Sequence, residues 1–242
     1  MSRLTLMPIF AHPDDESFVG TGSLITHVRS GGRAALVCAT RGERGKPGDP
    51  PLCTLDELPQ VREAELKNAC QILGIETLYL LDYVDKELSA APEEEALRKI
   101  VSAIRAERPQ VLYTFPPDGH SGHPDHLAIH RLANRAFRAA GDGSLFPEAG
   151  APWQPTHLYW HIWPGRTEGL SFDARIDTSG TQATWVAALR AHRTQHQSIE
   201  RVWQAFDPAF LAQRMDTEYF HLADTVLERP SAPVTDLFFG VR

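Results

Sequence analysis

The sequence predicts an α/β fold built around a mostly parallel β-sheet. Five apolar runs of strand length are rich in branched or aromatic residues, and segments with helical spacing of apolar residues lie between them. Because strands that alternate with helices over short connections form right-handed crossovers, we expect helices on both faces of the sheet, as in a three-layer sandwich. The predicted strands span residues 4–11, 34–40, 77–81, 111–115 and 157–162.

Glycine and proline residues bound most of the predicted helices. These helices span residues 22–29, 58–73, 93–108 and 181–200, and residues 199–214 either continue the last helix or begin another. Pro8 lies inside the first strand, where it removes a backbone donor, so we expect a local irregularity there. Residues 141–155 are rich in glycine, proline and small side chains, and we expect a loop on the mouth side of the sheet.

Length and composition limit the classes of function. The chain has 242 residues and 42% hydrophobic content, which is enough for a substantial core, and we expect a single domain over residues 1–242. The net charge is −7, the pI is about 5.9, and no cluster of basic residues is present, so we expect no nucleic-acid partner. The N-terminal apolar stretch is too short for a signal peptide or a membrane span, so we expect no membrane partner. Three scattered cysteines without CxxC spacing fit a reducing cytoplasm.

Two short motifs concentrate metal-ligand and proton-transfer side chains: HPDDE at residues 12–16 and HPDH at residues 123–126. The first follows the first predicted strand, and the second lies a short loop beyond the fourth. Because ligands bind at the carboxyl ends of strands in such sheets, we expect both motifs to face one cleft. His12, Asp15 and His126 would then form a two-histidine, one-carboxylate site for Zn²⁺ with an open position for water.

Other side chains of the motifs supply acid–base groups. Asp14 is placed to accept the proton of a metal-activated water, and His123 to donate a hydrogen bond to a developing oxyanion. His120 competes with His126 as a ligand, but we prefer His126 because it shares a rigid turn with His123. Asp125 is better explained as a helix-capping residue. The pattern therefore predicts a metal-dependent hydrolase.

These motifs resemble the LmbE or PIG-L family of zinc-dependent N-deacetylases, which act on N-acetylglucosaminyl compounds. The resemblance rests on AHPDDE and HPDH, on TRGERG after the second strand and on LRAHRTQ near the C-terminal helix, and it covers about residues 4–197. It implies a Rossmann-like fold, the same ligands and acid–base residues as above, and Zn²⁺ as the metal with Fe²⁺ as the alternative. It also implies a homo-oligomer that acts on a small N-acetyl amino sugar conjugate.

Three further segments, RxxEL, CxxLGI and LDYVDKEL, are similar to the branch proposed to deacetylate N-acetylglucosaminyl malate in bacillithiol synthesis. By that similarity Arg62 meets an anionic group of the substrate, for which its planar fork is suited. Asp85 and Glu43 would hydrogen-bond sugar hydroxyls, and His192 would line the cleft. Plainer alternatives remain: Arg62 and Glu65 could form an ion pair on a helix surface, Glu43 could belong to a glycine-rich turn, and His192 could lie on a helix surface.

The predicted reaction releases acetate and a free amine, and either Asp14 or His123 protonates the departing amine. A deacetylase of another N-acetylated sugar or small amide is an alternative. An iron(II) oxygenase can use the same ligand triad, but the alternation of strands and helices argues against the all-β fold usual for such enzymes. A non-enzymatic metal-binding module would leave Asp14 and His123 without a purpose.

Overall fold

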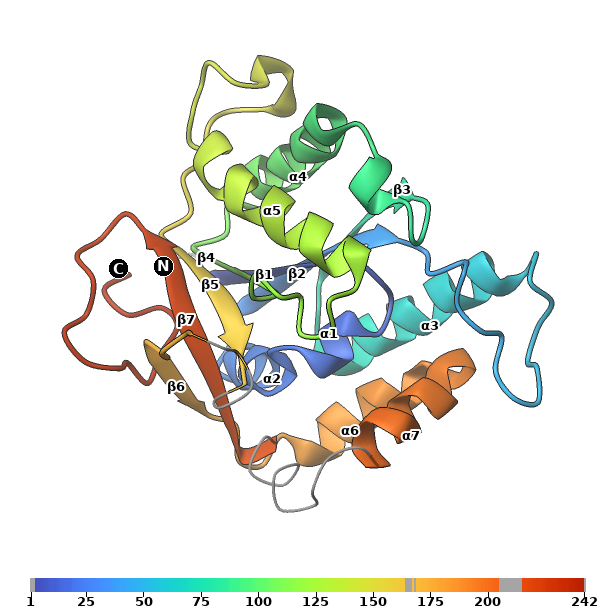
Figure 1. The fold of residues 1–242 in the computed structure, drawn as a ribbon. Coiled ribbons are helices and arrows are strands. Elements are labelled where there is room, and N and C mark those ends of the chain that lie inside the picture. The colour runs from blue at the N-terminus through green and yellow to red at the C-terminus, as the bar shows by residue number, and fades with distance from the viewer. Residues whose placement is uncertain (1–2, 164–166, 168, 205–214, 242) are drawn as a thin grey trace.

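A seven-stranded β-sheet forms the centre of the computed structural model, which describes residues 3–163, 167, 169–204 and 215–241 (Figure 1). Its strands are β1 (Thr5–Phe10), β2 (Arg33–Thr40), β3 (Thr77–Tyr83), β4 (Val111–Thr114), β5 (His157–Ile162), β6 (Ala174–Asp177) and β7 (Thr217–Thr225). The α-helices within these residues are α1 (Asp15–Phe18), α2 (Thr21–Arg29), α3 (Leu58–Leu73), α4 (Glu93–Glu107), α5 (Pro124–Ala139), α6 (Gln182–Ala191) and α7 (His196–Gln204). Short 3-10 helices are η1 (Leu88–Ala90), η2 (Pro147–Ala149) and η3 (Arg193–Gln195).

The strand order is β3-β2-β1-β4-β5-β7-β6. Neighbouring strands from β3 to β5 are parallel, whereas β7 runs antiparallel to both β5 and β6. Helices α4 and α5 cover one face of the sheet and α2 and α3 the other, with α6 packed against α3 (Figure 1). The predicted α/β sandwich with a mostly parallel sheet is thus confirmed.

The spacing of apolar residues explains this packing. Helix α4 carries one apolar stripe with helical spacing, and every side chain of the stripe is at most 2% exposed. The members of the stripe are Ala96, Leu97, Ile100, Val101 and Ile104. Strands β1 and β4 are buried along their whole length, as expected for central strands covered by helices on both faces.

Most predicted elements are present, and four of the observed α-helices and strands had no predicted range. The predicted strands agree with β1 to β5, and three of the predicted helices with α2, α3 and α4, to within two residues. These elements are α1, α5, β6 and β7. Strand β7 alternates between buried and half-buried residues and lacks a continuous apolar run. The helix expected over residues 181–200 is divided into α6, η3 and α7. Of the segment 199–214, residues 205–214 lie outside the described residues.

Pro8 produces the expected irregularity. Strand β1 pairs with β2 on either side of Met7 and Pro8 with the same register, but not at those two residues. On its other edge, Pro8 is paired with Tyr113 of β4. Because proline has no backbone donor, it interrupts one ladder without displacing the strand.

The prediction that residues 141–155 lie beside the cleft was wrong. This segment connects the end of α5 to the start of β5, so it lies at the amino edge of the parallel strands. Arg105 of α4 holds it there by donating hydrogen bonds to six backbone carbonyls between residues 139 and 150. In a parallel sheet, each helix returns the chain to the amino edge, which is opposite the ligand-binding edge.

The strand order creates a crevice between β1 and β4. These strands are neighbours, yet β2 lies on the outer side of β1 and β5 on the outer side of β4. In an open α/β sheet, such a switch point is where ligands bind, at the carboxyl ends of the strands. Both motifs follow those ends, His12 after β1 and His123 after β4. None of the helices in the described residues combines the length and the apolar composition needed to cross a membrane.

Candidate metal centre and active site

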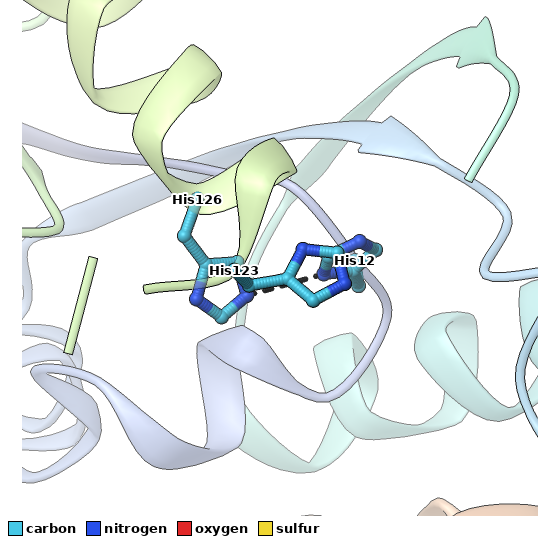
Figure 2. Close-up of side chains that lie close together, drawn as sticks. All are labelled: His12, His123 and His126. Carbon is cyan, nitrogen blue, oxygen red and sulfur yellow. Dashed lines mark hydrogen bonds between the residues drawn. The ribbon is translucent and has the colours of Figure 1, made fainter. Parts of the chain in front are cut away.

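Both motifs line one cavity of about 660 Å³ at the carboxyl ends of β1 and β4. His12 comes from the loop after β1, and His123 and His126 come from the start of α5, so that three imidazoles lie together (Figure 2). Asp14 and Asp15 line the same cavity. The fold therefore brings the two motifs into one cleft.

Two imidazole nitrogens and the two carboxylate oxygens of Asp15 face one another in this cavity. His12 Nδ1 lies 3.2 Å from His126 Nε2. Asp15 Oδ2 lies 3.6 Å from His12 Nδ1, and Asp15 Oδ1 lies 3.4 Å from His126 Nε2. In a tetrahedral zinc site with bonds of about 2.0–2.1 Å, neighbouring ligand atoms are about 3.3 Å apart. These residues could therefore hold Zn²⁺ and leave the fourth position open.

The hydrogen bonds on the outer sides of the two rings direct lone pairs toward this point. His126 Nδ1 lies 2.9 Å from the carbonyl oxygen of Gly119, which can only accept, so the neutral ring carries its proton on Nδ1. His12 Nε2 faces two carboxylates and carries the proton of its ring for the same reason. The facing atoms, His12 Nδ1 and His126 Nε2, are then both lone-pair atoms beside a carboxylate. This arrangement requires a cation, either a metal or an added proton.

The charges of the cluster favour such a cation. Burial alone would lower the pKa of His12, but three neighbouring carboxylates raise it well above its usual value. Burial alone would also lower the pKa of His126, but the neighbouring carboxylate of Asp15 raises it above its usual value. Burial would raise the pKa of Asp15, but the charge of His126 and a hydrogen bond with His12 lower it well below its usual range. The same groups would stabilise a divalent cation.

Two buried carboxylates orient His12 from its outer side. Asp85 Oδ1 and Asp125 Oδ2 each lie 3.1 Å from His12 Nε2. Asp125 also accepts hydrogen bonds from the backbone N–H groups of Lys86 and Leu88, at 2.6 and 3.1 Å. The prediction that Asp125 caps a helix was therefore wrong, because its buried carboxylate finds donors in the segment before α4. Such partners fix the tautomer and the orientation of a metal-ligating histidine.

Asp14 lies beside the ligand set on a strained backbone. Its φ of 102° and ψ of −27° fall in the left-handed region, which costs about 1–3 kcal/mol for a residue other than glycine. Arg62 donates to Asp14 Oδ2 at 3.1 Å and to the carbonyl oxygen of Pro13. Burial raises the pKa of Asp14 to about 6, with Arg62 opposing and Asp15 adding to the shift. A carboxylate with such a pKa can accept a proton near neutral pH.

His123 presents a hydrogen-bond donor to the cavity. It is the N-cap of α5, and its Nδ1 accepts the backbone N–H of Asp125 at 3.2 Å. The neutral ring therefore carries its proton on Nε2. Burial and the neighbouring imidazoles of His12 and His126 lower the pKa of His123, so the ring is neutral at pH 7. A neutral donor in this position can bind an oxygen on which negative charge develops.

Comparison with known proteins identifies the family. The family model described as "PIG-L: GlcNAc-PI de-N-acetylase" matches residues 7–137, which is more than half of the chain and contains both motifs. The chain belongs to the PIG-L family. A relative from Streptomyces avermitilis, a 1D-myo-inositol 2-acetamido-2-deoxy-alpha-D-glucopyranoside deacetylase, is 31% identical over 98% of this chain and 97% of its own length. The resemblance to LmbE and PIG-L deacetylases is thus confirmed.

Solved structures similar to this PIG-L protein share its fold. The crystal structure of the conserved protein TT1542 from Thermus thermophilus has a TM-score of 0.71 and 27% identity, covering 95% of this chain and 99% of that one. N,N'-diacetylchitobiose deacetylase from Pyrococcus horikoshii has a TM-score of 0.75 and 20% identity, covering 90% and 83%. The second likeness is evidence for the fold alone. Family membership places the chain among deacetylase enzymes.

His120, the competing ligand candidate, lies apart from the imidazole cluster of this PIG-L protein. Its Nε2 is 3.1 Å from His161 Nδ1, and its ring stacks on Trp163 with a centroid distance of 4.2 Å. His120 and Trp163 both line the cavity and give it an aromatic side. Such aromatic side chains offer a large apolar contact area to a bound molecule. No motif in the sequence singled out Trp163.

Basic side chains line another part of the same cavity. Arg44, Lys86 and Arg201 contribute to its wall. Arg44 forms an ion pair with Glu87, and Lys86 Nζ donates to the carbonyl oxygen of Arg44 at 2.8 Å. The wall of this cavity thus carries cations as well as the carboxylates of the motifs, in a chain of net charge −7.

Of the four predicted substrate-binding residues, two line the cavity, and the other two are not among its described lining residues. Arg62 and Asp85 line the cavity, although their side chains are almost wholly buried by protein contacts. The alternative of a surface pair between Arg62 and Glu65 was wrong, because both residues are buried and Glu65 instead accepts two hydrogen bonds from Thr194. Glu43 is not among the cavity-lining residues described, and its Oε1 accepts the backbone N–H of Asp85 at 3.0 Å.

His192, like Glu43, was predicted to bind substrate. It is fully buried, which rules out a helix-surface position, and its Nε2 lies 2.7 Å from Glu16 Oε1. Among the described residues it does not line the cavity that contains His12. Glu16 is part of the first motif, but no local pattern in the sequence indicates its partner, which lies 176 positions away.

Proposed function

We propose that this protein is a zinc-dependent hydrolase that removes the acetyl group from an N-acetylglucosaminyl conjugate. His12, Asp15 and His126 are the proposed ligands, Asp14 the general base and His123 the oxyanion donor. One observation carries the proposal: His12 Nδ1, His126 Nε2 and the carboxylate oxygens of Asp15 lie 3.2–3.6 Å apart, close to tetrahedral spacing, and the Asp14 carboxyl of raised pKa lies next to them. Membership in the PIG-L family supports the reaction class.

Each residue has a task in amide hydrolysis. When bound by the three ligands, zinc supplies Lewis acidity that makes a water nucleophilic near neutral pH. Asp14 accepts the proton of the attacking water, and Arg62 keeps its carboxylate in place. His123 donates its Nε2–H to the carbonyl oxygen as negative charge develops. Asp14 or His123 then protonates the departing amine, and acetate and a free amino sugar conjugate result.

Acetate release from a synthetic N-acetylglucosaminide tests these roles. We expect Asp14→Asn to bind zinc as the native protein does, while kcat falls by about 10²–10⁴-fold. We expect His126→Ala to lose zinc and activity together, whereas the control His196→Ala keeps both. Full activity of Asp14→Asn would refute the base, and full zinc occupancy of His126→Ala would refute the ligand set.

Removal and replacement of the metal test its identity. Chelation should abolish acetate release, and Zn²⁺ or Fe²⁺ added back to the metal-free protein shows which ion restores it. Full activity of protein shown to be free of metal would refute metal dependence. A protein that binds zinc tightly but releases no acetate from any conjugate would instead be the non-enzymatic module.

We further propose that the aglycone of the conjugate is anionic, as malate is in bacillithiol synthesis. Arg44, Lys86 and Arg201 in the cavity wall support this, because cations attract carboxylates. The relative from Streptomyces avermitilis is named for a neutral inositol conjugate, which is the competing substrate. An N-acetylated sugar or small amide without either group is the third alternative.

Comparison of kcat/KM for N-acetylglucosaminyl malate, the inositol conjugate and N-acetylglucosamine distinguishes these substrates. Lys86→Gln should lower kcat/KM for the malate conjugate by about threefold to tenfold and leave the inositol conjugate unchanged. Lys99→Gln is the control, because its ammonium pairs with Glu95 on α4. Equal effects of Lys86→Gln on both conjugates would contradict an anionic aglycone.

The location and assembly of the protein remain proposals. We propose that the protein is cytoplasmic, that each chain forms one deacetylase domain, and that several copies form a homo-oligomer. We propose that it binds neither nucleic acid nor a membrane. Cell fractionation tests the location, and light scattering of the purified protein tests the oligomer.

A further inference from the structure

The backbone at Asp14 needs an external support. Its positive φ of 102° is a conformation that residues with a Cβ rarely adopt, and α1, which begins at the next residue, is only four residues long. The N–H of Asp14 points into the protein and donates to Glu16 Oε2 at 3.0 Å. The carboxylate of Glu16 therefore binds the backbone of the proposed base directly.

A buried histidine holds that carboxylate from its other side. Glu16 Oε1 accepts a hydrogen bond from Ser17 Oγ at 2.6 Å and lies 2.7 Å from His192 Nε2. Glu16 is 1% exposed and His192 is 0% exposed. His192 Nδ1 has no hydrogen-bond partner within the described residues, so Nε2 makes the polar contact of the ring. The carboxylate accepts, so Nε2 carries the proton.

Helix α3 fixes the segment that carries His192. The residue lies at the break between α6 and η3. In η3, Thr194 donates from its N–H and its hydroxyl to Glu65 of α3, at 2.8 and 2.6 Å. One turn earlier on α3, Arg62 binds Asp14 Oδ2. Helix α3 thus supports Asp14 by two routes, directly through Arg62 and indirectly through η3, His192 and Glu16.

We propose that His192 and Glu16 are positioning residues that keep Asp14 in its left-handed conformation, with its carboxylate directed into the cavity. This inference rests on the proposed role of Asp14 as the general base. Neither residue touches the substrate cavity, so the pair acts through the geometry of Asp14. Misplacement of a catalytic group by about 1 Å can cost about 10²-fold in rate.

Two substitutions of His192 separate the hydrogen bond from the volume of the side chain. His192→Gln places an amide N–H near the position of Nε2 and should keep kcat within about threefold of the native value. His192→Leu has no donor and should lower kcat by about 10- to 100-fold, with KM and bound zinc unchanged. If both variants match the native kcat, or both fall equally, the proposal is wrong.

A double-mutant cycle tests whether the effect passes through Asp14. In the Asp14→Asn background, His192→Leu should cause no further loss of the residual rate, since the group it positions is already absent. An equal loss in both backgrounds would overturn the proposal. If His192→Leu does not fold, Glu16→Gln replaces it, because one amide cannot accept from both Asp14 N–H and His192 Nε2–H; an unchanged kcat would then refute the pair.

The outcomes separate this inference from the proposed function. Full activity of Asp14→Asn would show that Asp14 is not the general base. It would refute both the proposed mechanism and the positioning role of Glu16 and His192. An inactive Asp14→Asn together with a fully active His192→Leu leaves the base in place and refutes the positioning alone.

Discussion

Replacement of Asp125 by asparagine tests how the proposed metal ligand His12 is held. The two carboxylate oxygens of Asp125 accept from different donors. Oδ1 accepts the N–H of Leu88, whereas Oδ2 accepts the N–H of Lys86 and lies 3.1 Å from His12 Nε2. An asparagine has one acceptor oxygen and one NH₂ group. In either orientation, the NH₂ group therefore faces a donor that Asp125 satisfies in the native protein.

The structure gives the size of both expected effects. One buried N–H loses its acceptor, which costs about 1–3 kcal/mol of unfolding free energy in the metal-free protein. If the amide oxygen takes the Oδ2 position, His12 Nε2–H keeps an acceptor, but an uncharged one that binds it more weakly than the carboxylate. Loss of such a carboxylate partner typically weakens metal binding by about 10- to 100-fold. Asp85 also contacts His12 Nε2, so binding of zinc is weakened and not abolished.

Competition with a chromophoric chelator measures the loss of zinc affinity, and urea unfolding of the metal-free protein measures the loss of unfolding free energy. Asp56→Asn, at an exposed position on the loop before α3, is the matched control and should change neither quantity. Native zinc affinity in Asp125→Asn would show that the contact with His12 Nε2 does not orient the ring for metal binding.

Two further predictions concern residues remote from the cavity. Arg105→Met should lower the free energy of unfolding by about 2–4 kcal/mol, because the carbonyls of the segment before β5 lose their shared buried donor, with kcat unchanged; an effect below about 0.5 kcal/mol would contradict this. His157 is fully buried, and burial lowers its pKa below 6.5. Its neutral form therefore stabilises the fold fully above pH 6.5, and this contribution decreases as the pH falls through the lowered pKa. The stability difference between the native protein and His157→Gln should accordingly be larger at pH 7.5 than at pH 5, by at most about 1.4 kcal/mol per pH unit, and a difference independent of pH would refute the shift.

The central part of the fold was predictable because its signals are local. Each inner strand is a continuous apolar run, and a glycine or proline bounds most of the helices between them. Strand β6 is an edge strand, and β7 lies between it and β5. Both strands pair antiparallel and carry polar residues, so their sequences differ little from those of loops. No range was predicted for helix α5; the expected cap, Asp125, indicated only its start, and the observed N-cap is a histidine, His123, in place of the usual serine, threonine or aspartate.

The convergence of the proposed ligands was predictable for a different reason. His12 and His126 are 114 positions apart, but each follows a strand of the same sheet, and parallel strands present their carboxyl ends on one edge. Topology alone therefore brings the motifs together once the strands are assigned. The prediction needed no knowledge of any side-chain contact.

The groups that support the site follow no such rule. Asp85 and Asp125 hold His12, and His192 holds Glu16, through single hydrogen bonds whose partners are set by how helices and loops pack across the crevice. A carboxylate in a motif is equally compatible with a helix cap, a ligand or a buried partner of another side chain, and only the packed structure distinguishes these roles. Strand order therefore determines where the proposed metal site lies, and the buried polar contacts determine how rigidly the proposed ligands and the proposed base Asp14 are held.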